Sequence, residues 1–152
     1  MSTESLKQTL QSDLHTAMRE RDQVRTSTLR MALAAITTEE VSGASARELG
    51  DDETLKVVAK EGKKRREAAT AYRDAGRGEL AAGEEAELAI LETYLPEQLD
   101  DAAVDAIVER VVTDSGATSM AQMGQVMKAV QAEVAGRADG GAVAAKVRAR
   151  LS

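Results

Sequence analysis

Apolar residues recur every three or four positions along almost the whole chain, and no segment alternates between apolar and polar residues. A spacing of three to four places apolar side chains on one face of an α-helix, whereas half-buried strands require alternation. We therefore expect an all-α fold without a sheet, made of an N-terminal helical hairpin bundle followed by a small three-helix C-terminal module.

The first part of the chain is expected to contain four helices. The second helix follows a break near Asp22, and a loop over 42–45 precedes the third. Asp51 or Asp52 is expected to cap this third helix, which runs over about 52–75 and is roughly 36 Å long. The turn Gly76-Arg77-Gly78 ends it, and the fourth helix carries Leu80, Glu84, Leu88, Leu91 and Leu95.

The third helix carries a heptad seam with two unusual members. Its inward positions are expected to be Leu55, Val58, Gly62, Arg65, Ala69 and Tyr72. Gly62 costs roughly 1 kcal/mol relative to alanine in a helix interior. Arg65 fits a seam if its aliphatic stem packs inside, so we expect its guanidinium to reach water.

Pro96 is the only proline in the chain. It cannot continue a helix, and it disfavours helical angles at Leu95. We therefore expect a domain boundary at this point, with an N-terminal helical bundle over 1–95 and a C-terminal three-helix module over 96–152.

The C-terminal module is expected to form three short helices. Asp100 or Asp101 caps the first, which ends at Ser115-Gly116, and the next begins between Ser119 and Met123. The last runs from about Gly140 to Leu151.

The turn before the last helix, 136–141, has unusually specific chemistry. Gly136 suits the left-handed conformation that ends a helix. Asp139 can accept N–H groups at the start of the last helix. Gly140 and Gly141 leave that start open to close approach.

The end of the chain is basic, although the whole chain has a net charge of −6. Over 128–152 five cations face two acids, whereas 96–127 holds one cation and six acids. A helix start with free N–H groups favours an anion, although the carboxylate of Asp139 competes for it. We therefore expect the cations of this stretch to bind an anionic partner: Lys128, Arg137, Lys146, Arg148 and Arg150.

A second basic stretch lies on the third helix, where eight cations face three acids over 56–77. Four lysines fall three to four residues apart and share one helix face: Lys56, Lys60, Lys63 and Lys64. Such a row can follow a phosphate backbone through charge pairing and counterion release. The alternative is that these lysines only balance acidic residues on neighbouring helices.

Several function classes lack the residues that they need. The chain has no cysteine, which excludes thiol catalysis and thiolate metal sites, and it has no Walker-type phosphate loop. His15 is the only histidine, so we expect no metal and no cofactor. The start Met1 to Glu4 lacks the features of a signal peptide, and no apolar run has the roughly 20 residues that a bilayer requires. We expect a cytoplasmic protein without a membrane segment.

Several segments, in this order, resemble the GatB/YqeY family across essentially the whole chain. They are Leu29-Arg30-Met31, 60–65, Ala75-Gly76-Arg77, 94–99, 123–128 and 136–140. In that family a related helical domain forms the tail of the B subunit of the glutamine-dependent tRNA amidotransferase, where it helps to hold tRNA. The resemblance thus implies a link to carbon–nitrogen ligase activity with glutamine as amide donor. Gly62 and Gln125 depart from the β-branched residue and the lysine that we expect there.

The leading hypothesis is an accessory, tRNA-binding-type helical protein that performs no catalysis when isolated. Its partners would be tRNA and a protein of tRNA amidation or translation. The alternative hypothesis is a protein–protein adaptor with no nucleic-acid role, which docks an acidic or amphipathic partner. An enzyme whose site is not visible in the sequence is a third hypothesis.

Overall fold

The computed structural model describes residues 4–152, so most of the Met1 to Glu4 start lies outside the described part. Over these residues the chain forms seven α-helices and one short 3₁₀ turn, with no strand. The helices are α1 (Leu6–Arg19), α2 (Gln23–Glu40), α3 (Asp51–Asp74), α4 (Gly78–Glu92), α5 (Asp101–Ser115), α6 (Met123–Val134) and α7 (Gly140–Leu151). The expected all-α fold is confirmed.

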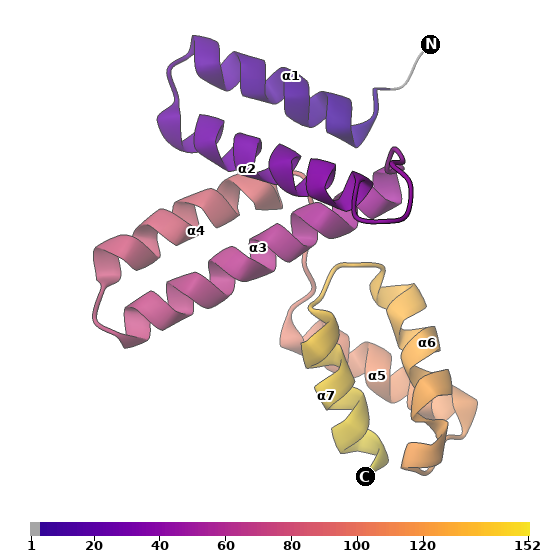
Figure 1. Cartoon of the computed structure of the whole chain (residues 1–152). Helices are drawn as coiled ribbons and strands as arrows, with labels where there is room; N and C mark the ends of the chain where they lie inside the picture. Colours follow the sequence, from indigo (N-terminus) through magenta and orange to yellow (C-terminus); the bar gives the residue numbers. More distant parts are fainter. Residues whose placement is uncertain (1–3) are drawn as a thin grey trace. The chain divides into compact units, whose positions relative to one another are not determined.

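The chain divides into two compact units, Met1–Leu95 and Pro96–Ser152. The first unit holds two helical hairpins, α1–α2 and α3–α4, and α2 packs against α1, α3 and α4 (Figure 1). The second unit holds α5, α6 and α7, each of which packs against the other two.

Short polar side chains fix the starts of several helices. Asp22, Asp100 and Asp139 each accept a backbone N–H from the first turn of the helix that follows. The expectation for α3 is wrong, because its N-cap is Gly50, which has no side chain to offer. Asp51 instead accepts the N–H of Leu6, 3.0 Å away, and so joins the start of α3 to the start of α1.

The seam of α3 is only partly as predicted. Val58, Gly62, Arg65 and Ala69 are buried, whereas Leu55 and Tyr72 are only half-buried. On α4, Leu91 is buried, but Leu80 is exposed and Ala81 takes its place in the core.

The expectation that Arg65 reaches water is also wrong, because its side chain is only 6% exposed. Its Nη1 lies 2.5 Å from a carboxylate oxygen of Glu61, one turn earlier on α3. Its Nε lies 3.4 Å from a carboxylate oxygen of Glu87 on α4, and its Nη2 lies 3.4 Å from the sulfur of Met31 on α2. Two carboxylates therefore compensate the buried charge, which water would otherwise solvate.

Each unit has its own aliphatic core. In the first unit the core combines leucines with Ile36 and Val58, and the Tyr94 hydroxyl donates to Asp13 at 2.5 Å. Burial and this hydrogen bond raise the pKa of Tyr94 to about 12. In the second unit, valines from α5, α6 and α7 converge on one another.

We expect Arg65→Ala to lower the free energy of unfolding by about 3 kcal/mol, because it removes the closest cation from the Glu61 carboxylate, whose side chain is only 11% exposed. Urea denaturation followed by circular dichroism measures this. The control is Arg66→Ala, one residue along on the exposed face of α3, which should change the value by no more than about 0.5 kcal/mol. Equal effects of the two substitutions would contradict a structural role for the buried ion network.

We also expect a fragment of residues 96–152 to keep its helical circular dichroism signal and to melt cooperatively, because its core lies entirely within that range. A fragment without helical signal would show that the boundary at Pro96 does not separate two independent folding units.

Candidate nucleic-acid interface

The lysine row of α3 lies on the outward face of the helix. Lys56, Lys60, Lys63 and Lys64 are all exposed, and they lie opposite the buried residues Val58, Gly62, Arg65 and Ala69. From Lys56 to Lys63 the row spans about 10 Å along the helix axis. The structure thus brings these four cations together on one surface, as the spacing predicts.

Neighbouring acids neutralise only part of the positive charge of this row. Lys64 forms an ion pair with Glu61 at 3.4 Å. Lys56 and Lys60 form no hydrogen bond or ion pair with residues of the described part of the chain, although both line a shallow hollow with Glu39 and Glu53. The row therefore retains cationic groups that are accessible to a phosphate.

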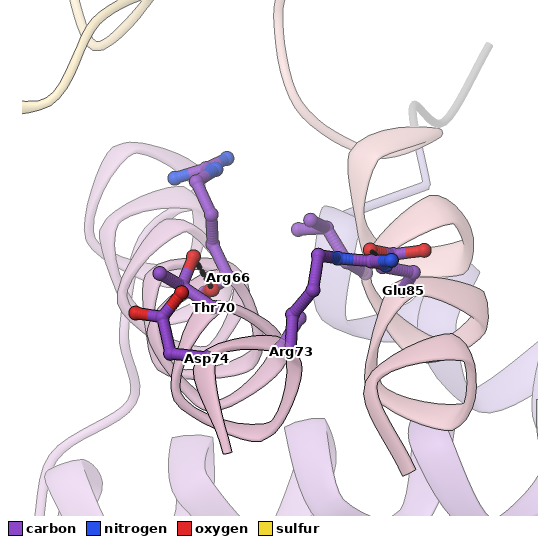
Figure 2. A pocket seen from close by; sticks show the side chains of 7 residues that line it. Arg66, Thr70, Arg73, Asp74 and Glu85 are labelled. Carbon is purple, nitrogen blue, oxygen red and sulfur yellow. Dashed lines mark hydrogen bonds and ion pairs between the residues drawn. The ribbon is translucent and has the colours of Figure 1, made fainter. Parts of the chain in front are cut away.

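A groove between α3 and α4 adjoins the same helix. It has a volume of about 210 Å³ and is lined by Arg66, Ala69, Thr70, Arg73, Asp74, Glu85 and Leu88. Figure 2 shows Arg73 reaching from α3 to Glu85 on α4, with which it forms an ion pair, whereas Arg66 points away from that pair. Arg66 forms no ion pair within 4–152, so it extends the basic surface of α3.

The basic end of the chain is largely engaged in internal contacts. Lys146 lies 2.8 Å from Asp105 and 3.8 Å from Asp101, both on α5. Arg150 donates two hydrogen bonds to the carboxylate of Glu109, at 2.6 and 3.1 Å. These contacts raise the pKa of Lys146 and of Arg150 and lower that of Glu109. A phosphate would have to displace a carboxylate from either cation.

Arg137 also has an internal role, because its guanidinium donates to the carbonyl oxygens of Glu133 and Val134 at 2.8 and 3.0 Å. It thereby satisfies free carbonyl groups at the end of α6. Two of the five candidate cations in this unit, Lys128 and Arg148, are exposed and form no ion pair with any described residue.

The turn between α6 and α7 differs in one detail from the prediction. The first left-handed residue is Ala135, with φ of 49°, and Gly136 follows with φ of 78°. Asp139 caps α7 as expected and accepts the N–H of Ala142 at 3.1 Å. The Gln131 side chain lies close to Gly140, so the start of α7 is less open than its glycines indicate.

One signal in the sequence could have revealed the partners of the C-terminal cations. The acids Asp101, Asp105 and Glu109 follow one another at intervals of four, as do Lys146 and Arg150. When two helices pack side by side, as α5 and α7 do, acids on one and cations on the other can form ion pairs if both recur at the same spacing.

A metal site in this chain would require a histidine or a cluster of acids among the described residues. His15 is exposed, and no group of three or more acidic or histidine residues in the described part is arranged to hold a metal ion. No helix formed by residues 4–152 is long and apolar enough to cross a membrane.

These features define a small all-helical protein of two units with exposed cations on shallow surfaces. The family described as Yqey-like protein matches residues 7–151, and the chain belongs to this family. Over 87 residues it is also 36% identical to altered inheritance of mitochondria protein 41, mitochondrial, from Meyerozyma guilliermondii. This match covers 57% of the chain but only 44% of that relative.

We expect the purified chain to release no ammonia from glutamine and to consume no ATP in the presence of charged tRNA, because it has neither a cysteine nucleophile nor a phosphate-binding loop. A coupled assay for glutamate and ADP checks this, with a complete amidotransferase as the positive control. Turnover that persists through further purification would contradict the prediction.

Proposed function

We propose that this chain is an accessory RNA-binding protein that holds tRNA while another polypeptide carries out the chemistry. The observation that carries this proposal is the lysine row on α3, where Lys56 and Lys60 are exposed and form no ion pair with described residues. The similarity of the chain to the tail domain of the amidotransferase B subunit supports tRNA as the RNA and amidation as the process. The cytoplasmic location stays a prediction.

The net charge of −6 does not oppose a local site of this kind. At physiological ionic strength the Debye length is about 8 Å, so a phosphate on the row is influenced mainly by nearby groups. Binding should therefore depend strongly on salt and on cations of the row. Lys128 and Arg148 on the second unit are further candidates, whereas Arg137, Lys146 and Arg150 are less available because they have internal partners.

We expect Lys60→Ala to weaken tRNA binding and to flatten the plot of log affinity against log salt by roughly 0.7 to 0.9 units, because one phosphate contact is lost. Fluorescence anisotropy with labelled tRNA at several salt concentrations measures both quantities. The control is Arg19→Ala, which removes one exposed cation from the last turn of α1.

The same titration with Lys128→Ala and with Arg148→Ala tests the second unit. If Lys60→Ala and Arg19→Ala have equal and small effects, the lysine row is a solvated helix face and the RNA-binding proposal fails.

A further inference from the structure

The outward face of α2 differs from the rest of this highly charged surface. Seven exposed residues share the outward side of the helix, and one of them, Arg30, is charged: Gln23, Ser27, Arg30, Met31, Ala34, Thr37 and Thr38. Met31 lies at the edge of this face, where its sulfur also contacts the Arg65 guanidinium. The chain as a whole has 30% charged residues. Most of the large apolar side chains that are exposed in residues 4–152 lie on α2, at its end or beside it: Met18 (45%), Val24 (47%), Met31 (49%) and Val41 (60%).

A groove lies beside the first half of this face, where α1 ends and α2 begins. It has a volume of about 450 Å³ and is lined by Met18, Arg21, Gln23, Thr26, Ser27 and Arg30. Two of these residues are cations and none is an acid. The Arg30 guanidinium lies 3.8 Å from the sulfur of Met18, so a cation and an apolar side chain meet inside the groove.

The two acids of the adjoining turn, Glu20 and Asp22, both contact Arg25 and not the arginines of the groove. Asp22 accepts the backbone N–H of Arg25 at 3.1 Å, and the Glu20 carboxylate lies 4.0 Å from the Arg25 guanidinium. Arg21 and Arg30 form no ion pair with any residue of the described part of the chain. These two arginines are notable in this part of the chain, because residues 4–95 contain more acids than cations, 18 against 14.

We propose that the outward face of α2 and the α1–α2 groove dock an amphipathic helix of a partner protein that carries carboxylates along one flank. Apolar side chains of such a helix would cover Met18, Met31 and Ala34, while its carboxylates would reach Arg21 and Arg30. Anchors at i, i+3, i+4 and i+7 are the usual way in which one helix binds to such a surface. This site is distinct from the lysine row on α3 and does not depend on RNA binding.

A protein fits this surface better than RNA does. Backbone phosphates gain affinity from closely spaced cations, and the α2 face offers only one over seven positions. Exposed methionine and valine side chains contribute to binding affinity only when apolar groups of the partner bury them.

The first experiment places a photo-crosslinking amino acid at Ala34 in the full chain inside cells, with Ala71 on the outward side of α3 as the matched control position. Mass spectrometry then identifies the crosslinked segment. The expected product, at position 34 and not at position 71, is a segment of another protein that reads as a helix with an apolar row and an acidic flank. A product with RNA, with a second copy of the chain or with its own residues 96–152, or the absence of a product, would overturn the proposal.

The second experiment uses a synthetic peptide of the crosslinked segment and measures its affinity for the full chain by fluorescence anisotropy. Arg30→Glu should weaken binding at least tenfold, whereas Arg77→Glu, at an exposed position in the α3–α4 turn, should leave it within twofold. A second peptide, in which the acids of that flank are replaced by lysine, should bind the Arg30→Glu variant more tightly than it binds the unsubstituted chain. Equal effects of the two arginine substitutions would show that the groove does not recognise carboxylates.

Discussion

The buried guanidinium of Arg65 contacts residues of three helices of the first unit, its own helix α3 and the neighbouring α4 and α2. It pairs with Glu61 on its own helix and with Glu87 on α4, and it touches the sulfur of Met31 on α2. Glu61 moves with Arg65 because both lie on α3, so a shift of α4 along its axis would break only the 3.4 Å contact with Glu87. That contact favours one register of the α3–α4 hairpin. Gly62 faces the same hairpin: a Cβ there would meet the side chains of Leu88 and Leu95 at 3.5 and 3.9 Å, which is ordinary van der Waals contact.

Both units hold some cations in ion pairs and leave others exposed. In the second unit, Lys146 and Arg150 of α7 form ion pairs with Asp105 and Glu109 of α5. In the first unit, Lys56 and Lys60 project from α3 and form no ion pair with residues 4–152, and the neighbouring α2 has a face with a single charged residue, Arg30. The two helices therefore present surfaces of different chemistry.

The period of the apolar residues was enough to predict the helices. The cap at Asp139, and that at Asp100 as one of two alternatives, followed from local chemistry. The environment of Arg65 could be predicted only in part. Glu61 lies four residues earlier on the same helix, a spacing that the sequence shows, whereas the contact with Glu87 depends on which residues of α4 face α3, which a single sequence does not show. The cap of α3 was missed for a related reason: Asp51 has a partner in α1, 45 residues away. For the candidate site, spacing placed the α3 lysines on one surface, but whether a cation is available depends on contacts between helices.

The core of the second unit has a consequence for how that unit loses its structure. Within 96–152, all of which the structure describes, nine of the eleven buried core residues are valines. A buried valine has little side-chain freedom to lose, so packing is favoured, but valine is a weak helix former in isolation. The helices of this unit consequently depend on one another, and a state that keeps helical backbone after its side chains have come apart would have little to stabilise it. Unfolding of the unit should be abrupt, with secondary structure and side-chain packing lost in one step.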